Sequence, residues 1–153
     1  KILNQDLVHS TTNGTVAISV AKEGMPNEIL VGAFSNISFL SDYLLKKEEN
    51  VLLLCSGWKN SFCIEDTVFC GALIDKLLQS NEFTNHNDSA NCSLELWNAA
   101  KDNLMGYMEK ASHFHRLRKY KMDDVFDYTF TFNTTKVVPK LYGDRLQNAL
   151  KEE

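Results

Sequence analysis

The stretch of residues 51–78 constrains the fold more than any other part of the chain. An apolar run over 51–55 breaks at Ser56-Gly57, and apolar residues then recur at helical spacing over 64–78. A run of strand-forming residues, a turn and an amphipathic helix together make one strand–turn–helix unit. The sequence therefore predicts a buried strand over 51–55 and a helix that begins near Glu65.

Two earlier stretches have the same organisation. Residues 1–25 contain a predicted strand (6–9), a hydroxyl-rich turn and an apolar helical stripe. Residues 28–44 contain the run 28–34, the turn Ser35-Asn36 and another helix. Successive units of this kind are typical of a parallel sheet covered by helices. The runs lack strict alternation, as strands covered on both faces do. We therefore expect an α/β fold, a three-layer α/β/α arrangement with a mainly parallel sheet.

The C-terminal half is predicted to add elements around this sheet. They are a polar connection over 79–92, a long amphipathic helix over 93–108, a basic segment over 112–119, a short helix over 121–128, and an edge strand over 136–141 followed by a Gly143-Asp144 turn. Proline is tolerated in an edge strand. We expect all 153 residues to form a single α/β domain.

Composition and charge exclude several classes of protein. A net charge of −4 argues against a nucleic-acid surface, which is normally basic. The apolar runs are far shorter than the ~20 residues that span a bilayer. The four cysteines form no Cys-x-x-Cys pair, and no apolar leader follows Lys1. The interpretation is a reduced, cytoplasmic protein without a nucleic-acid or membrane partner, in which Cys55 and Cys70 are core residues.

Polar residues follow each predicted strand. In a parallel sheet the strand-to-helix turns lie at one edge, where ligands bind, and hydroxyls and backbone N–H groups at helix N-termini bind anions. The three turns are therefore predicted to share one phosphate- and substrate-binding rim, formed by Thr11, Thr12, Asn13, Gly14, Thr15, Ser35, Asn36, Ser56, Gly57 and Lys59.

A carboxylate pair, Glu65-Asp66, begins the third predicted helix. Beside anion donors, such a pair suits a Mg²⁺ ion that also contacts a phosphate, since magnesium takes one or two carboxylates and completes its shell with water and phosphate oxygens. Glu65 and Asp66 are therefore candidate catalytic and metal-binding residues. The same pair is also explained by favourable interaction with the positive end of the helix dipole.

The basic segment holds two further candidates. His113 and Arg116 lie three residues apart, so on a helix both could face one ligand. A solvated basic turn explains the same spacing. The chain contains neither a Gly-x-Ser-x-Gly nucleophile motif nor a Gly-x-x-x-x-Gly-Lys nucleotide loop.

Several motifs resemble, in order, those of the 2-phosphosulfolactate phosphatase family. They are Ser10-Thr11-Thr12-Asn13-Gly14-Thr15, Val31-Gly32-Ala33-Phe34-Ser35-Asn36, Cys55-Ser56-Gly57-Trp58, Glu65-Asp66 with Cys70-Gly71-Ala72, Ser112 with Leu117, Asp124, and Val138-Pro139. The resemblance implies a magnesium-dependent α/β phosphatase that hydrolyses 2-phospho-3-sulfolactate to 3-sulfolactate and phosphate, a step of coenzyme M biosynthesis.

By position, the resemblance implies anion binding by Thr11–Thr15 and Ser35-Asn36, metal binding or catalysis by Glu65-Asp66, and substrate contacts by His113 and Arg116. Family members are longer, and their N-terminal part carries an Asp-x-x-Arg-Ala-Thr type segment that is not found here. By its motifs the chain resembles the C-terminal two-thirds of such members, so we expect a further N-terminal segment to be required for activity and consider a homodimer.

Two other functions remain open at this point. One is the same hydrolysis on another phosphorylated hydroxy acid, because a family resemblance does not fix the substrate. The other is a non-catalytic anion-binding or assembly domain.

Overall fold

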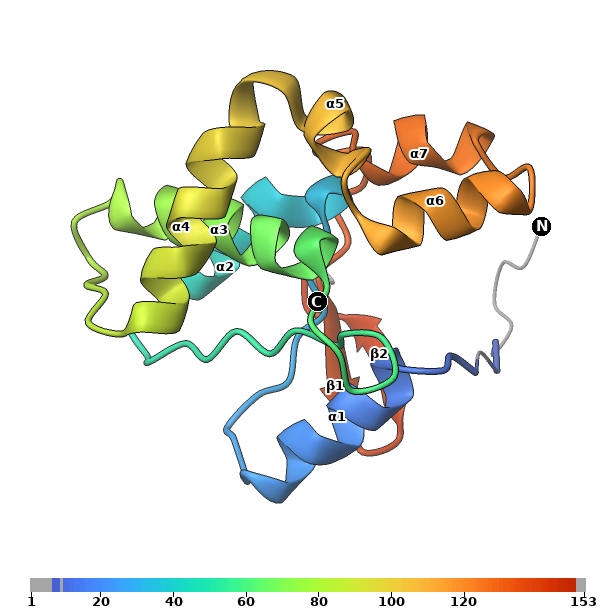
Figure 1. The fold of residues 1–153 in the computed structure, drawn as a ribbon. Helices are drawn as coiled ribbons and strands as arrows, with labels where there is room; N and C mark the ends of the chain where they lie inside the picture. The colour runs from blue at the N-terminus through green and yellow to red at the C-terminus, as the bar shows by residue number, and fades with distance from the viewer. Residues whose placement is uncertain (1–6, 9, 151–153) are drawn as a thin grey trace.

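The computed structural model describes residues 7–8 and 10–150, and these residues are mainly helical (Figure 1). The helical elements, including two short 3-10 helices (η), are α1 (Gly14–Glu23), η1 (Phe34–Asn36), α2 (Ile37–Leu45), α3 (Ile64–Leu78), α4 (Asp88–Ala100), η2 (Lys101–Asn103), α5 (Leu104–Met108), α6 (Ser112–Lys119) and α7 (Asp124–Thr129). The strands are β1 (Pro139–Tyr142) and β2 (Arg145–Asn148).

The expected three-layer α/β/α fold with a mainly parallel sheet is wrong. The sheet of the described residues has two strands, β1 and β2, which pair antiparallel across the Gly143-Asp144 turn. Residues 28–34, predicted as a strand, contribute one antiparallel bridge, between Leu30 and Lys140. The edge strand predicted over 136–141 is thus partly confirmed as β1.

The apolar run 51–55 lies in no helix and in no strand. Val51 and Leu53 are half-buried, whereas Leu52 is 90% exposed. One face of this segment is therefore covered, and not both faces as the sequence indicated. An apolar run favours extended backbone locally, but a sheet requires a neighbouring strand, and the described residues supply none here.

The predicted first strand falls largely outside the described residues, because Asp6 and His9 are among those not described. Leu7 and Val8 belong to no strand.

Most of the predicted helices are present. α1, α2, α3 and α7 form where the sequence placed them. α4 begins earlier than expected, inside the predicted polar connection, because the Asn87 side chain caps it by accepting a hydrogen bond from the Ala90 N–H (2.8 Å). The long helix expected over 93–108 is divided into α4, η2 and α5. None of the described helices is long and apolar enough to pass through a bilayer.

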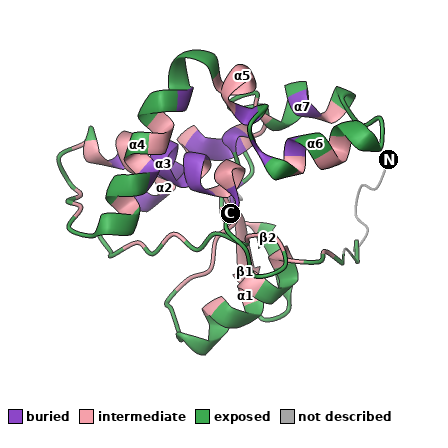
Figure 2. Cartoon of the chain, viewed as in Figure 1, coloured by how far each residue is buried: buried purple, intermediate pink, exposed green. Residues whose placement is uncertain are grey.

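The core lies between α2, α3 and α4, with η1, α6 and α7 packed beside it (Figure 2). Val68 and Leu73 of α3 are 0% and 1% exposed. α3 and α4 cross closely at Gly71, where an added Cβ would lie 2.0 Å from the Ser93 carbonyl oxygen. α3 is therefore the central helix of this core, and its N-terminal end reaches out of the core to the candidate site.

Candidate functional site

A cavity of about 350 Å³ lies between the start of α1, the loop before α3 and the first turn of α6. Its lining residues are Thr11, Thr12, Asn13, Gly14, Ser56, Gly57, Trp58, Cys63, Glu65, Asp66 and His113. Figure 1 shows the green loop that precedes α3 beside the blue α1. The N-terminal ends of α1 and α3 both border the cavity, so their helix dipoles favour negative charge there.

A tight turn holds the loop before α3 in shape. Trp58 and Ser61 exchange backbone hydrogen bonds (3.0 and 2.9 Å), and the two residues between them, Lys59 and Asn60, both have positive φ, 51° and 59°. That combination is typical of a type I′ turn. The Lys59 N–H donates to the Asn13 side-chain oxygen (3.3 Å). The turn is thereby joined to the start of α1.

Asp66 lies in the first turn of α3 and is fixed by the same loop. Its Oδ2 accepts hydrogen bonds from the Gly57 N–H (2.7 Å) and from the Ser56 hydroxyl (3.2 Å). Gly57 has φ +64°, and an added Cβ would lie 2.7 Å from the Ser61 carbonyl oxygen. Only glycine adopts this conformation without strain, so the contact with Asp66 depends on it.

Glu65 and Arg116 compete for one nitrogen of His113. His113 Nδ1 lies 3.2 Å from Glu65 Oε1 and 2.7 Å from Arg116 Nη2. A guanidinium carries only donors, so the shorter contact uses the Nδ1 lone pair and places the ring proton on Nε2. Arg116 also stacks on Trp58, with Cζ 3.5 Å from the ring centroid. These contacts join α6 to the loop and to α3.

Cys63 lines the cavity but is a poor nucleophile. Burial, followed by the negative charges of Glu65 and Asp66, raises the pKa of the Cys63 thiol to about 11. The reactive form of cysteine is the thiolate. Near neutral pH, Cys63 is therefore present as the thiol.

The hydroxyls at the start of α1 have partners of their own. The Thr15 N–H donates to the Thr11 hydroxyl (3.1 Å), and the Thr15 hydroxyl donates to the Thr11 carbonyl (2.9 Å). Thr11 and Thr12 border the cavity, whereas Thr15 does not. The predicted anion donors of this turn are thus placed at the cavity, except Thr15.

The second predicted turn lies elsewhere. Asn36 is buried, and its amide donates to the carbonyls of Val31 (3.2 Å) and Val137 (2.9 Å) while its oxygen accepts from the Ala33 N–H (2.9 Å). Ser35 accepts a backbone bond from Thr135. These hydrogen bonds fasten η1 to the chain before β1. The expectation that all three turns share one rim is therefore wrong for Ser35-Asn36, because residues 7–8 and 10–150 form no parallel sheet that would align the turns.

Two other predicted residues lie at the margin. Lys59 meets Asn13 through its backbone, and its Nζ lies 5.8 Å from the Trp58 ring centroid. Arg116 reaches the site through His113 and Trp58. Neither side chain lines the cavity itself.

The carboxylates fit a hard cation better than a soft one. Among residues 7–8 and 10–150, no three His, Cys, Asp or Glu side chains gather into a metal cage. Mg²⁺ does not need one, because one or two carboxylates with water and phosphate oxygens suffice. Glu65 and Asp66 both border the cavity and offer oxygen ligands. The residues present are thus compatible with Mg²⁺.

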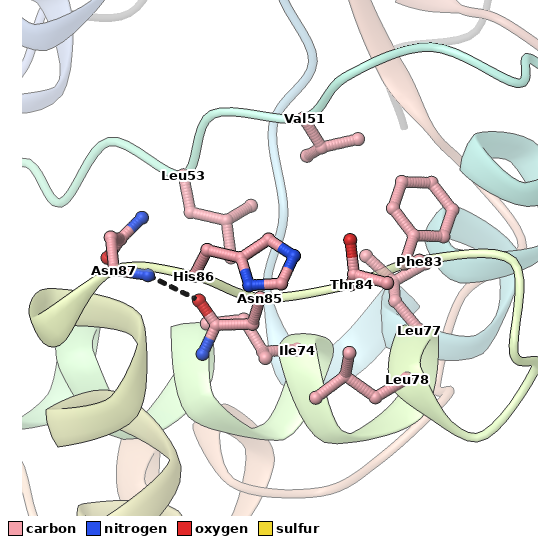
Figure 3. Close-up of a pocket in the computed structure, with 10 residues that line it drawn as sticks. All are labelled: Val51, Leu53, Ile74, Leu77, Leu78, Phe83, Thr84, Asn85, His86 and Asn87. Carbon is pink, nitrogen blue, oxygen red and sulfur yellow. Dashed lines mark hydrogen bonds between the residues drawn. The ribbon is translucent and has the colours of Figure 1, made fainter.

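A second, smaller cavity of about 140 Å³ lies near the other end of α3 (Figure 3). Val51 and Leu53 cover it from one side, and Ile74, Leu77 and the loop 83–87 complete it. None of the predicted site residues lines this cavity. Polar donors and carboxylates gather at the larger cavity.

Comparison with known proteins identifies the family of this chain. A sequence model described as 2-phosphosulpholactate phosphatase matches residues 1–144. The chain belongs to the 2-phosphosulpholactate phosphatase family. It is 26% identical over 141 residues to a probable 2-phosphosulfolactate phosphatase of Caldanaerobacter subterraneus subsp. tengcongensis, covering 92% of the chain and 57% of that relative. A protein of the same name from Nostoc punctiforme is 33% identical over 135 residues, covering 85% of the chain and 54% of that relative.

The chain spans about half the length of these curated relatives. The resemblance to the 2-phosphosulpholactate phosphatase family, stated from the motifs, is thereby confirmed. Family membership does not assign roles to single residues, so the roles given to the lining residues stay predictions.

Sequence reasoning did not place Trp58 and Cys63 among the site residues of this family member. Trp58 follows Ser56-Gly57 directly, and Cys63 precedes the first turn of α3. The sequence feature that could have indicated Trp58 and Cys63 is their position next to predicted site residues. The sequence could not show that Arg116 stacks on Trp58, because this contact joins segments far apart in the chain.

Proposed function

We propose that the intact protein is a phosphatase that hydrolyses a small anionic phosphoester, with 2-phospho-3-sulfolactate as its substrate. The observation that most supports this is a shared cavity. The residues Thr11–Gly14 before and at the start of α1 line it with candidate anion donors, and Glu65 and Asp66 line it with carboxylates. The relatives named probable 2-phosphosulfolactate phosphatase support the same substrate.

The surroundings of the cavity suit an ester with several negative groups. The N-terminal ends of α1 and α3 favour anions, and the backbone N–H groups there can donate to phosphate oxygens. The net charge of −4 does not oppose binding, because local donors decide the potential inside a cleft.

We further propose Mg²⁺ as the cofactor, held by Asp66 with Glu65 as a second ligand. When bound, the ion supplies charge neutralisation at the phosphoryl oxygens and a lower pKa for a coordinated water. Asp66 is suited to this because the Gly57 N–H and the Ser56 hydroxyl fix its orientation. A carboxylate fixed in advance loses little conformational freedom on binding.

His113 and Arg116 would serve the non-reacting end of the substrate. In the Nε2–H form, His113 can donate to an acidic group in the cavity, and the Arg116 guanidinium holds the ring in that form. Arg116 is in turn fixed by stacking on Trp58. We propose that His113 contacts the substrate and that Arg116 positions His113.

Phosphate release from 2-phospho-3-sulfolactate by the intact protein tests this function. We expect turnover with Mg²⁺, loss of turnover with a chelator, and a fall in kcat of roughly 100-fold or more for Asp66→Asn, since removal of one electrostatic contact in an active site costs that much. The amide of the substituted side chain keeps the shape of the carboxylate, and its oxygen can still accept from the Gly57 N–H, so folding should be retained.

Asp42→Asn is the matched control, because Asp42 is an exposed aspartate on α2. It should leave kcat unchanged. Unchanged turnover in a folded Asp66→Asn protein would refute the role given to this carboxylate. Binding of the ester without phosphate release, with and without Mg²⁺, would indicate an anion-binding domain instead.

A further inference from the structure

Two cysteines face each other beside the cavity. Cys55 ends the apolar run 51–55, Cys70 lies in α3, and their sulfur atoms are 3.5 Å apart. Cys55 is exposed, contrary to its expected place in the core, whereas Cys70 is buried. The sequence separation of fifteen residues hides this pairing, which only the packing of the run against α3 produces.

The two thiols differ in how readily they ionise. The hydrogen bond from Cys70 lowers the pKa of Cys55 to about 7, against the opposing effects of partial burial and of the Asp66 carboxylate. The hydrogen bond to Cys55, together with burial, raises the pKa of Cys70. Cys55 is therefore the exposed, attacking thiol and Cys70 the shielded one, as in resolving pairs of redox-active proteins.

We propose that Cys55 and Cys70 form a reversible disulfide, with a low-molecular-weight disulfide such as oxidised glutathione as the oxidant. A disulfide bond is ~2.05 Å long, so the sulfur atoms must approach by about 1.5 Å. A rotamer adjustment at the exposed Cys55 can supply such a movement.

The reaction consists of two exchanges. The Cys55 thiolate attacks one sulfur of oxidised glutathione, a Cys55–glutathione mixed disulfide forms, and one glutathione thiolate leaves. Cys70 then gives its proton to solvent and attacks Cys55 Sγ, which releases the second glutathione. Two protein thiols are oxidised to one disulfide, and one small disulfide is reduced to two thiols.

The second exchange is favoured by the first. The negative charge on Cys55 is one of the causes that raise the pKa of Cys70. In the mixed disulfide that charge is gone, so Cys70 ionises more readily. The disulfide would fasten the residue before Ser56-Gly57 to α3, one turn beyond Asp66, and so fix the loop that holds this carboxylate.

The first experiment treats the intact protein with oxidised glutathione and identifies cross-linked peptides by mass spectrometry. Cys92→Ser serves as background, because Cys92 is an exposed cysteine on α4. We expect a Cys55–Cys70 peptide pair with a loss of two hydrogen atoms, restored by dithiothreitol. A Cys55–Cys63 pair, or a stable glutathione adduct on Cys55 without a cross-link, would overturn the proposal. None of these readouts depends on phosphatase activity.

Two substitutions at Cys70 separate its roles. Cys70→Ser keeps a hydrogen-bond donor but cannot form the disulfide, so the glutathione adduct on Cys55 should accumulate. Cys70→Ala removes the donor as well. The pH midpoint of Cys55 alkylation by iodoacetamide should then rise from about 7 toward the ~8.5 of a free thiol.

The rate of alkylation at pH 7 should fall about 3-fold in Cys70→Ala, because the loss of thiolate exceeds the gain in its nucleophilicity. An unchanged midpoint in a folded Cys70→Ala protein would show that the two sulfur atoms do not interact, and would overturn the proposal independently of the cross-linking result.

Discussion

α1 and α3 arise from the same sequence pattern and end in different surroundings. Each follows a polar turn and carries an apolar stripe, but α3 buries seven residues and α1 buries none (Figure 2). In α1, Val16 and Val20 remain about half exposed. An apolar stripe therefore determines that a helix forms, whereas its burial depends on what packs against it. The candidate cavity lies where the exposed helix and the buried helix begin.

The largest expected difference between the two helices is in stability. Leu73→Ala in α3 removes a side chain that is 1% exposed and leaves a cavity, so the free energy of unfolding should fall by about 3 kcal/mol. Val20→Ala in α1 should lower it by less than ~1 kcal/mol. Urea denaturation of the two variants measures both values. Equal losses would mean that α1 is covered in solution.

A pair of glycines tests the packing of the same helices. Gly71→Ala places a methyl group against α4, 2.0 Å from the Ser93 carbonyl, so the helices must separate at a cost of about 1–3 kcal/mol. Gly24→Ala, after the end of α1, meets its nearest atom at 3.4 Å and should change stability by less than ~0.5 kcal/mol. Thermal unfolding ranks the two. A neutral Gly71→Ala would contradict the close crossing of α3 and α4.

An ion-pair cluster around Glu28 joins the end of α2 to β1 and should make the free energy of unfolding depend on pH. Glu28 accepts hydrogen bonds from Lys140 (2.6 Å), Lys47 (2.9 Å) and Tyr43 (2.9 Å). Partial burial alone would raise the pKa of Glu28 above its ordinary value of 4.5. The three donors outweigh this effect and lower the pKa to about 2.

Because the folded-state pKa is lowered, the stabilisation is fully present above pH 4.5 and is lost as the pH falls toward 2. Glu28→Gln should therefore cost about 1 kcal/mol at pH 7 and progressively less between pH 4.5 and 2. Urea midpoints across this range measure the difference. A constant difference at every pH would show that the charge of Glu28 has no part in it.

The smallest expected difference within a pair of variants is between two asparagines at helix starts. Asn87→Ala removes the cap of α4 and should cost about 1 kcal/mol. The Asn13 side chain makes no cap in α1 and instead accepts from the Lys59 N–H at 3.3 Å, so Asn13→Ala should cost only about 0.5 kcal/mol. Hydrogen exchange should show the loop 57–61 opening more often in Asn13→Ala alone. The reverse order of costs would mean that Asn13 caps α1 in solution.

The sequence predicted elements whose causes are local. The helix beginning near Glu65-Asp66 is confirmed, since apolar spacing over 64–78 and acidic residues in the first turn are properties of neighbouring residues. The polar turns before α1 and α3 were recognised as anion-binding candidates for the same reason, and the structure brings these two together.

The sheet could not be predicted in this way. The runs 28–34 and 51–55 were predicted as strands, but within them only Leu30 forms a bridge, and Phe34 already belongs to η1. Strand pairing depends on segments distant in sequence, and β1 pairs chiefly with β2. Ser35-Asn36 shows the consequence. Its sequence predicts a polar turn at a helix start, as in the other two units. In the structure, however, Asn36 is buried, and its amide donates to the carbonyls of Val31 and Val137 instead of facing the cavity.

By itself the sequence determined where α1, α2, α3 and α7 form, which turns are rich in donors and which family the motifs resemble, because each of these depends on residues close together in the chain. Tertiary structure alone decided that the start of α1 faces the carboxylates of α3, that Arg116 stacks on Trp58, and that Cys55 meets Cys70. The physical reason is that burial and pairing are properties of two surfaces in contact, and a single stretch of sequence specifies only one of them.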